Sequence, residues 1–381
     1  MLTRIHLHNY NCFVSFELAL SQRLLIVGSN GSGKSSLWEA LACIQDVAVR
    51  GHDVADAFPT RALTRWLHED LQRFALEFQL GPDRYRYELQ VIHDRKRRVP
   101  TVALERVTLE GDAARSLYEI KDGKVHLYGD HPSPSPRTTF DFGRKRSFLP
   151  DLEERHDNQR LIAVRKALDA IWLLAPSRRF GSTATDDAYW LDRRGQNLTA
   201  WLRGLFAERA GVSAALLEDL QPIMAGLRDI GMKPISKEVR ELSLTFRGAG
   251  IDYPIAVDEL SDGQRVLLML YAFRRGISDR AATAFVDEPE TGLAPHEMQP
   301  WLAAMSADVE ERGGQFLAAS HHPAVVDYMS PHRAVRLFRP GGMAVCSDEV
   351  TLETTGGARV SEWLSQPWAY EDEHGQEGGS S

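Results

Sequence analysis

Residues 28–35 read Gly-Ser-Asn-Gly-Ser-Gly-Lys-Ser, a glycine-rich stretch that ends in Lys-Ser. It fits the pattern GxxxxGK[ST] of a phosphate-binding loop. The apolar run Leu24–Val27 precedes it and predicts a strand buried on both faces, as in a parallel sheet. A helix is expected from about Lys34 to Gln45. A strand, a glycine-rich loop and a helix in this order are the context that a phosphate loop requires.

The loop predicts which residues hold a nucleotide. Its backbone N–H groups would surround the phosphates, and the N-terminus of the following helix adds a positive dipole end. Lys34 would reach the β- and γ-phosphates, and the Ser35 hydroxyl would bind Mg²⁺. We therefore expect ATP and Mg²⁺ as cofactors. The predicted nucleotide-binding residues of this segment are Gly28, Ser29, Asn30, Gly31, Ser32, Gly33, Lys34, Ser35 and Ser36.

A second motif, Ala284-Phe285-Val286-Asp287-Glu288-Pro289-Glu290, places acidic residues after an apolar strand. Delivery of an aspartate to the carboxyl end of a strand is the Walker B arrangement. Asp287 would hold the magnesium shell, and Glu288 can polarise the attacking water. Taken alone, the motif also fits a solvated acidic turn, but the upstream phosphate loop favours the ATPase interpretation. Lys34 and Glu288 are thus predicted to be catalytic.

Two further features indicate the kind of P-loop ATPase. Leu260-Ser261-Asp262-Gly263-Gln264 is predicted to open a helix, and Ala319-Ser320-His321-His322-Pro323 follows the predicted strand 315–319. A Ser-x-Gly cap offers N–H groups and a hydroxyl to a phosphate. Because the phosphate loop already has its own nucleotide, this cap would serve another subunit.

These two features predict further site residues. Ser261, Gly263 and Gln264 would bind the nucleotide of the partner, and His321 could contact the γ-phosphate as a third catalytic residue. An N-cap serine or a lone histidine is more often merely structural. The order and spacing of all four motifs favour the functional interpretation.

The four motifs resemble those of ABC-type ATPase heads, with LSDGQ similar to the LSGGQ signature and His321 similar to the switch histidine. The opening Ile5-His6-Leu7-His8-Asn9-Tyr10 and the segment GSNGSGKSSLWEAL resemble the RecF and SMC-related branch. Relatives of this branch include overcoming-lysogenization-defect (OLD) proteins and stand-alone bacterial defence ATPases. The resemblance covers residues 1–45 and 240–330. It implies that two heads sandwich two ATP molecules and that a D-loop follows Walker B at residues 290–295.

The sequence departs from the family pattern at several positions. Asp262 stands where transporters carry glycine, and Asn11 stands where an arginine often follows Asn-Phe. The glutamine of the Q-loop is open between Gln45, Gln79 and Gln90. We find neither a zinc-hook CxxC nor a long coiled coil, which excludes tethering over long distances.

The expected fold class is α/β, a two-lobed ABC-ATPase-type P-loop head with a mixed β N-terminal lobe and a helical insert. Alternating apolar residues around Gly81-Pro82-Asp83 and around Asp122-Gly123 predict two antiparallel hairpins. Apolar stripes over Leu161–Trp172 and Leu198–Phe206 predict helices. The predicted domains are an N-terminal lobe with the phosphate loop and hairpins (1–157), the helical insert (158–234), a C-terminal lobe with signature, Walker B and switch histidine (235–364), and an acidic flexible tail (365–381).

Composition limits the partners and the compartment. The 45 Lys and Arg against 53 Asp and Glu give a net charge of −8, so any nucleic-acid contact needs a local basic patch. Arg95, Lys96, Arg97 and Arg98 form a candidate patch for DNA, and a solvated loop is an equally open interpretation. Three scattered cysteines suit a reducing cytoplasm and argue against a zinc site. No apolar run is long enough to span a bilayer, so we expect a cytoplasmic protein without a membrane partner.

The sequence therefore predicts a Mg-dependent ATP hydrolase that dimerises head-to-tail around ATP. It would act as a switch in bacterial DNA repair or anti-phage defence, together with a separately encoded effector, a nuclease or a toxin. The alternative is the nucleotide-binding subunit of an ABC transporter. The long segment between Lys34 and Ser261 and the lack of a recognisable coupling helix speak against that alternative. A slowly hydrolysing scaffold is a third interpretation, and the intact Glu288 speaks against it.

Overall fold

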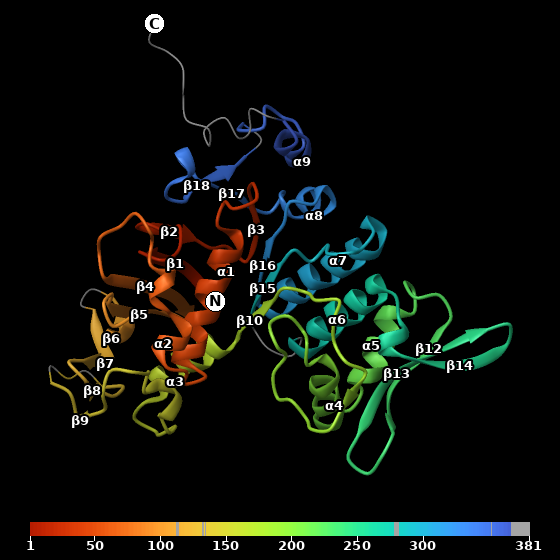
Figure 1. Ribbon diagram of the computed structural model, residues 1–381, viewed down its shortest axis with the longest axis horizontal. Coiled ribbons are helices and arrows are strands. Elements are labelled where there is room, and N and C mark those ends of the chain that lie inside the picture. The colour runs from red at the N-terminus through yellow and green to blue at the C-terminus, as the bar shows by residue number, and fades with distance from the viewer. Residues whose placement is uncertain (112–113, 132, 134, 278–281, 352, 367–381) are drawn as a thin grey trace, which may run out of the picture. The chain divides into compact units, whose positions relative to one another are not determined.

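The computed structural model describes residues 1–111, 114–131, 133, 135–277, 282–351 and 353–366 (Figure 1). The chain divides into two units, and each is described by itself. The first unit comprises Met1–Ile171 and Met329–Ser381, and the second comprises Trp172–Tyr328. These bounds differ from the predicted domain ends at 157 and 234. The predicted acidic tail 365–381 lies outside the described residues from 367 onward.

An eight-stranded sheet dominates the first unit, with the order β2-β1-β4-β5-β6-β7-β8-β9 and antiparallel pairing throughout. Both predicted hairpins are confirmed, as β4–β5 and β7–β8. Asp122 and Gly123 have φ values of 51° and 76°, as a type I′ turn requires. The strands are β1 (Leu2–His8), β2 (Phe16–Ala19), β4 (Leu71–Leu80), β5 (Asp83–Asp94), β6 (Val99–Glu110), β7 (Arg115–Lys121), β8 (Lys124–Leu127) and β9 (Thr138–Asp141).

One face of this sheet is apolar and the other is charged. Leu76, Tyr87 and Val107 are aligned across β4, β5 and β6 and are buried. The neighbouring pair Glu77 and Arg86 points to the opposite face and forms an ion pair of 2.7 Å. Such alternation is typical of an antiparallel sheet with one solvated face. Helices α2 (Val54–Ala57) and α3 (Gln159–Asp169) contact strands of this sheet.

The first unit also holds the strand that leads into the phosphate loop. Strand β3 (Arg23–Val27) pairs in parallel with β17 (Ala334–Phe338), and β17 pairs antiparallel with β18 (Cys346–Val350). Residues Leu24–Val27 are fully buried, which confirms the predicted two-sided burial. Helix α1 (Lys34–Ala48) follows the loop. The remaining elements of this unit are η1 (Thr60–Ala62), η2 (Leu149–Asp151), η4 (Pro340–Gly342) and α9 (Val360–Leu364).

The second unit contains the two strands that lead into the acidic and histidine motifs. Strands β15 (Thr283–Asp287) and β16 (Gln315–Ala319) are parallel and fully buried. Helix α6 (Asp262–Ile277) begins at the signature, and α7 (Pro295–Arg312) contacts both α6 and β16. The other elements are α4 (Leu198–Glu208), α5 (Val212–Leu220), α8 (Pro323–Met329), η3 (Val257–Glu259) and the antiparallel strands β11 (Thr183–Ala184), β12 (Leu227–Pro234), β13 (Arg240–Gly248) and β14 (Ile251–Ala256).

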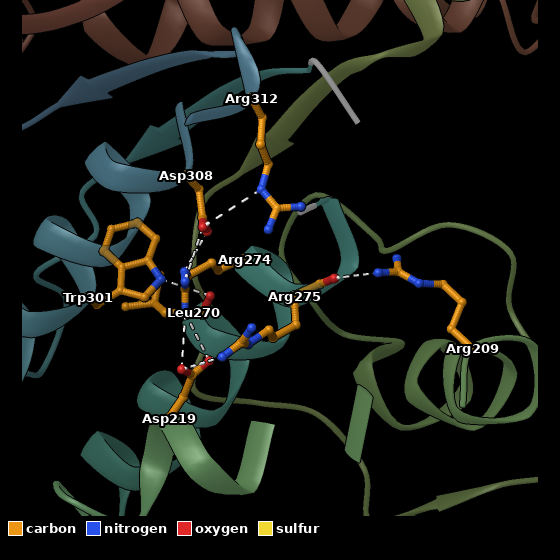
Figure 2. A network of polar contacts seen from close by, with 8 residues as sticks. All are labelled: Arg209, Asp219, Leu270, Arg274, Arg275, Trp301, Asp308 and Arg312. Carbon is orange, nitrogen blue, oxygen red and sulfur yellow. Dashed lines mark hydrogen bonds and ion pairs between the residues drawn. The ribbon is translucent and has the colours of Figure 1, made fainter. Parts of the chain in front are cut away.

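A half-buried ionic network joins α5, α6 and α7 (Figure 2). Asp219 of α5 accepts hydrogen bonds from both Arg274 and Arg275 of α6, at 2.5–3.1 Å. Arg274 also donates two bonds to Asp308 of α7, at 2.6 and 3.1 Å. The Trp301 indole N–H adds a bond of 2.9 Å to the Leu270 carbonyl. The helix that begins at the signature is therefore fixed at its far end.

The stretch predicted as a helical insert, 158–234, is not wholly helical. It holds α3, α4 and α5, but also β10 (Ile171–Leu174), β11 and β12. The apolar stripe Leu161–Trp172 is not one helix, because α3 ends at Asp169 and Ile171 begins a strand. Ile171–Leu174 is a short continuous apolar run, which fits a buried strand as well as the end of a helical stripe, and burial in the folded chain decides between them.

Candidate functional site

The loop between β3 and α1 has the close packing that only glycine permits. Gly28 and Gly33 have φ values of 152° and 111°. A Cβ atom at Gly28 would lie 2.3 Å from the Leu337 carbonyl oxygen, and one at Gly33 would lie 2.9 Å from Val345. The loop therefore presses against β17 and the segment before β18, and larger residues would open it.

Polar groups of this loop point inward. The Lys34 side chain is buried, and its ammonium donates to the carbonyl oxygens of Gly28 and Ser29 at 2.8 and 2.9 Å. The buried Ser32 hydroxyl has no hydrogen-bond partner among the described residues. A cation and an unsatisfied hydroxyl inside a glycine-lined loop fit a phosphate group, which would accept bonds from both. Of the other predicted loop residues, Asn30, Gly31 and Ser35 are exposed, and Ser29 and Ser36 are half-buried.

At the end of β15 the backbone takes an unusual conformation. Asp287 is buried, and Glu288 has a φ of 52°, in the left-handed region. The Glu288 N–H donates to the Ala319 carbonyl at 2.8 Å, and the Thr291 hydroxyl donates to the Glu288 carbonyl at 2.9 Å. Such a conformation costs about 1–2 kcal/mol for a residue other than glycine, so these bonds must hold it in place. The Glu288 carboxylate remains 46% exposed.

The second unit brings the acidic motif and the histidine motif together. His321 Nδ1 lies 3.5 Å from Glu288 Oε1 and 4.0 Å from Glu290 Oε1. The Ser320 hydroxyl donates to Glu290 Oε1 at 2.8 Å and accepts from the His322 N–H at 3.0 Å. Two of the three predicted catalytic residues, Glu288 and His321, are thus neighbours.

Glu290 was not predicted as a site residue. Its side chain is 7% exposed, and its Oε2 atom has no hydrogen-bond partner among the described residues. Burial raises the pKa of this carboxyl, although the Ser320 hydrogen bond acts in the opposite direction. The signal that could have found Glu290 is a second carboxylate two residues after Glu288 in the same turn.

The signature residues form the predicted N-terminal cap of α6. The Ser261 hydroxyl accepts from the Gln264 N–H at 3.3 Å, and Gln264 Oε1 accepts from the Ser261 N–H at 3.0 Å. This reciprocal pair is a capping box. Gly263 approaches the D-loop segment, since a Cβ there would lie 3.3 Å from the Gly292 carbonyl oxygen. Ser261 and Asp262 are exposed at the helix end.

The basic segment 95–98 forms the turn between β5 and β6 and is exposed, as expected of a loop. Arg95 pairs with Asp70 at 2.5 Å. Asp94 accepts from the backbone N–H groups of Lys96 and Arg97, both at 3.0 Å. Two carboxylates therefore lie within or beside this patch and reduce its positive charge.

The three Q-loop candidates have local partners. Gln45 is buried and donates to the Ile171 carbonyl at 2.7 Å, so it secures the chain after α3. Gln79 donates to the Gly81 carbonyl, and Gln90 donates to the Glu88 carboxylate.

In the described part of the chain there is no group of three or more His, Cys, Asp or Glu residues arranged to hold a metal ion. No described helix is long and apolar enough to cross a membrane.

Comparisons with known proteins agree with this architecture. The family model described as "AAA domain, putative AbiEii toxin, Type IV TA system" matches residues 24–327. A solved SMC head bound to the C-winged helix domain of ScpA is 13% identical, with a TM-score of 0.52 over 92% of this chain and 98% of that one. The SMC head of Pyrococcus furiosus with an extended coiled coil, bound to the C-terminal domain of ScpA, is 12% identical, with a TM-score of 0.51 over 92% and 96%. At these identities the likeness concerns the fold. No curated protein matches the chain.

Proposed function

Since the chain belongs to the AbiEii-type AAA domain family and has the fold of an SMC ATPase head, we propose that it is an ATP-operated switch in bacterial defence or DNA repair. It is a P-loop ATPase of the AAA/SMC-like kind. The observation that carries the proposal is the glycine-lined loop with the buried Lys34 ammonium and the unsatisfied Ser32 hydroxyl.

We assign the roles of the residues around ATP as follows. Lys34 binds the β- and γ-phosphates, and the loop N–H groups surround them. Ser35 and Asp287 would hold Mg²⁺, which would neutralise phosphate charge when bound. The Glu288 carboxylate polarises the attacking water, and its strained backbone keeps it at the end of β15. His321 contacts the γ-phosphate from its place beside Glu288.

The proposed switch requires two copies of the chain. Ser261, Gly263 and Gln264 stand at the exposed start of α6, where the helix N-terminus can face a phosphate of a second copy. ATP would therefore close a head-to-tail homodimer. We propose a separately encoded effector, a toxin or a nuclease, as the partner. The family description supports a two-component system, and it gives the AAA domain itself as the putative toxin. DNA contact through residues 95–98 belongs to the same proposal.

Two variants test the proposal. Lys34→Ala should abolish ATP binding, because the loop loses its inward cation. Glu288→Gln should still bind ATP but lower kcat by about 10²-fold or more, because the water is no longer polarised. The same variant should accumulate as a dimer in ATP, measured by light scattering. Glu311→Gln, an exposed carboxylate of α7, is the matched control. Wild-type turnover by Glu288→Gln would refute its assigned role, and unchanged ATP binding by Lys34→Ala would refute the site.

A further inference from the structure

Three arginines lie in or next to β17: Arg333 before the strand, Arg336 within it and Arg339 directly after it. Arg339 differs from the other two. Arg333 pairs with Glu349 at 2.6 Å, and Arg336 pairs with Asp348 at 3.1 Å. Arg339 forms no ion pair with any residue that the structure describes. Its guanidinium donates to backbone carbonyls instead: Met343 at 2.8 Å, Gly342, and Gly31 at 3.4 Å.

The Gly31 carbonyl belongs to the phosphate loop, so Arg339 lies beside the predicted nucleotide. The pairing of β3 with β17 explains this position, because the carboxyl ends of parallel strands meet at one edge of a sheet. The loop follows β3 at that edge, and Arg339 follows β17. Residues 308 positions apart in sequence thus become neighbours.

Trp66 holds the guanidinium from another side. The Arg339 Cζ atom lies 5.7 Å from the centre of the half-buried indole ring, within the range of a cation–π interaction. An arginine has five N–H donors, and the three carbonyl bonds occupy three of them. The segment therefore presents an oriented cation next to the phosphate loop, and no carboxylate of the described residues pairs with it.

We propose that Arg339 is a second cationic contact for the phosphates of the bound nucleotide and that Trp66 is its positioning residue. This inference rests on the proposed function. A guanidinium suits the site because its planar fork matches phosphate oxygens, and a nucleotide would supply the missing counter-charge. Arg339 would then act together with Lys34.

The test measures the affinity of the full chain for Mg-ATP and for inorganic tripolyphosphate by calorimetry. Arg339→Ala should weaken both ligands by about 10- to 100-fold, the usual range for a lost charge-assisted hydrogen bond. Arg339→Lys should weaken them less, because the charge remains and the fork is lost. Arg333→Ala, at the other end of the same strand, is the control and should change affinity less than about two-fold.

Trp66 variants keep the test valid if Arg339→Ala unfolds. Trp66→Phe should bind like wild type because a ring remains, whereas Trp66→Leu should weaken both ligands. Unchanged affinity for tripolyphosphate in Arg339→Lys and Trp66→Leu would overturn the inference, as would a change confined to the preference for ATP over GTP. If Lys34→Ala loses affinity for both ligands while the Arg339 and Trp66 variants keep it, only this inference fails. If Lys34→Ala binds both ligands as wild type does, the proposed function fails as well.

Discussion

Glu105 is a carboxylate on the apolar face of the first unit's sheet. It is fully buried and accepts hydrogen bonds from the hydroxyls of Tyr87, Tyr118 and Ser147, at 2.9, 2.6 and 2.7 Å. Burial raises the pKa of Glu105, and the three hydrogen bonds oppose that effect only in part. The group joins β5, β6 and β7 to the loop at Ser147.

This raised pKa predicts a pH dependence of stability. The folded chain holds the Glu105 proton more tightly than the unfolded chain. The stabilisation is therefore fully present below the unfolded pKa and is lost as pH rises through the folded pKa. The free energy of unfolding of Glu105→Gln minus that of the wild type should therefore increase as pH rises from acid to neutral, because only the wild type loses this stabilisation. Urea unfolding at a series of pH values measures this, with Glu110→Gln at the exposed end of β6 as the control. A difference that stays constant with pH would contradict the prediction.

Glu290 is expected to position His321 by holding Ser320. Glu290→Gln keeps an oxygen for the Ser320 hydroxyl, so kcat for ATP should fall less than about three-fold. Glu290→Ala leaves the buried hydroxyl without this acceptor and should cost about 1–3 kcal/mol of stability. The same variant should lower kcat at least about ten-fold, because His321 loses its place beside Glu288. Equal losses in both variants would show that the charge of Glu290 matters rather than the hydrogen bond. Steady-state kinetics and thermal unfolding separate these outcomes.

At the level of secondary structure, α6 connects the signature with the half-buried ionic network. Ser261 and Gln264 cap the first turn of α6. In its last turns, Arg274 and Arg275 donate hydrogen bonds to Asp219. Arg209, directly after α4, donates to the Arg275 carbonyl at 3.2 Å (Figure 2). It also donates to the Gly276 carbonyl at 2.9 Å, so both carbonyls near the end of the helix have partners. Both ends of α6 are thus held by specific hydrogen bonds, so its orientation within the second unit is well determined.

The network predicts a large loss of stability when one carboxylate is removed. Asp219→Ala should lower the free energy of unfolding by about 1.5–3 kcal/mol, because two half-buried guanidiniums would lose their shared charged acceptor. Asp252→Ala is the matched control. It breaks another two-bond arginine pair of the same unit, with Arg247 at 2.6 and 2.8 Å, but that pair is exposed and should contribute much less. Similar losses in the two variants, measured in urea, would show that the network does not stabilise α6.

At the scale of the whole molecule, the predicted site residues are distributed over the two units. The first unit carries the phosphate loop and Arg339, and the second carries the signature, Asp287, Glu288 and His321. In the proposed dimer, each ATP uses the phosphate loop of one copy and the signature of the other. A defect in one motif should therefore be complemented by a copy that is defective in the other.

Mixing two inactive variants tests this arrangement. Ser261→Arg places a bulky cation at the cap of α6, and Lys34→Ala removes the cation of the phosphate loop. Each alone should be inactive, while an equal mixture should recover up to roughly a quarter of wild-type hydrolysis, since half of the dimers then contain one intact site. Differently tagged copies confirm that mixed dimers form, and thermal unfolding checks the loss of the Ser261 cap. Mixed dimers without any activity would refute the head-to-tail arrangement.

Features that depend on a local sequence pattern could be predicted without the structure. The glycine spacing at 28–33, the turn at Asp122-Gly123 and the Ser261-x-Gly263 cap each depend on a few consecutive residues, so their patterns predict their conformation. Other contacts are visible only in the folded chain. Arg339 lies beside Gly31 and Trp66, and the Ser320 hydroxyl donates a hydrogen bond to Glu290. The tertiary structure also made Ile171–Leu174 a strand rather than the end of a helix. These contacts join residues far apart in the chain, and burial by distant segments decides them, so no local pattern contains them.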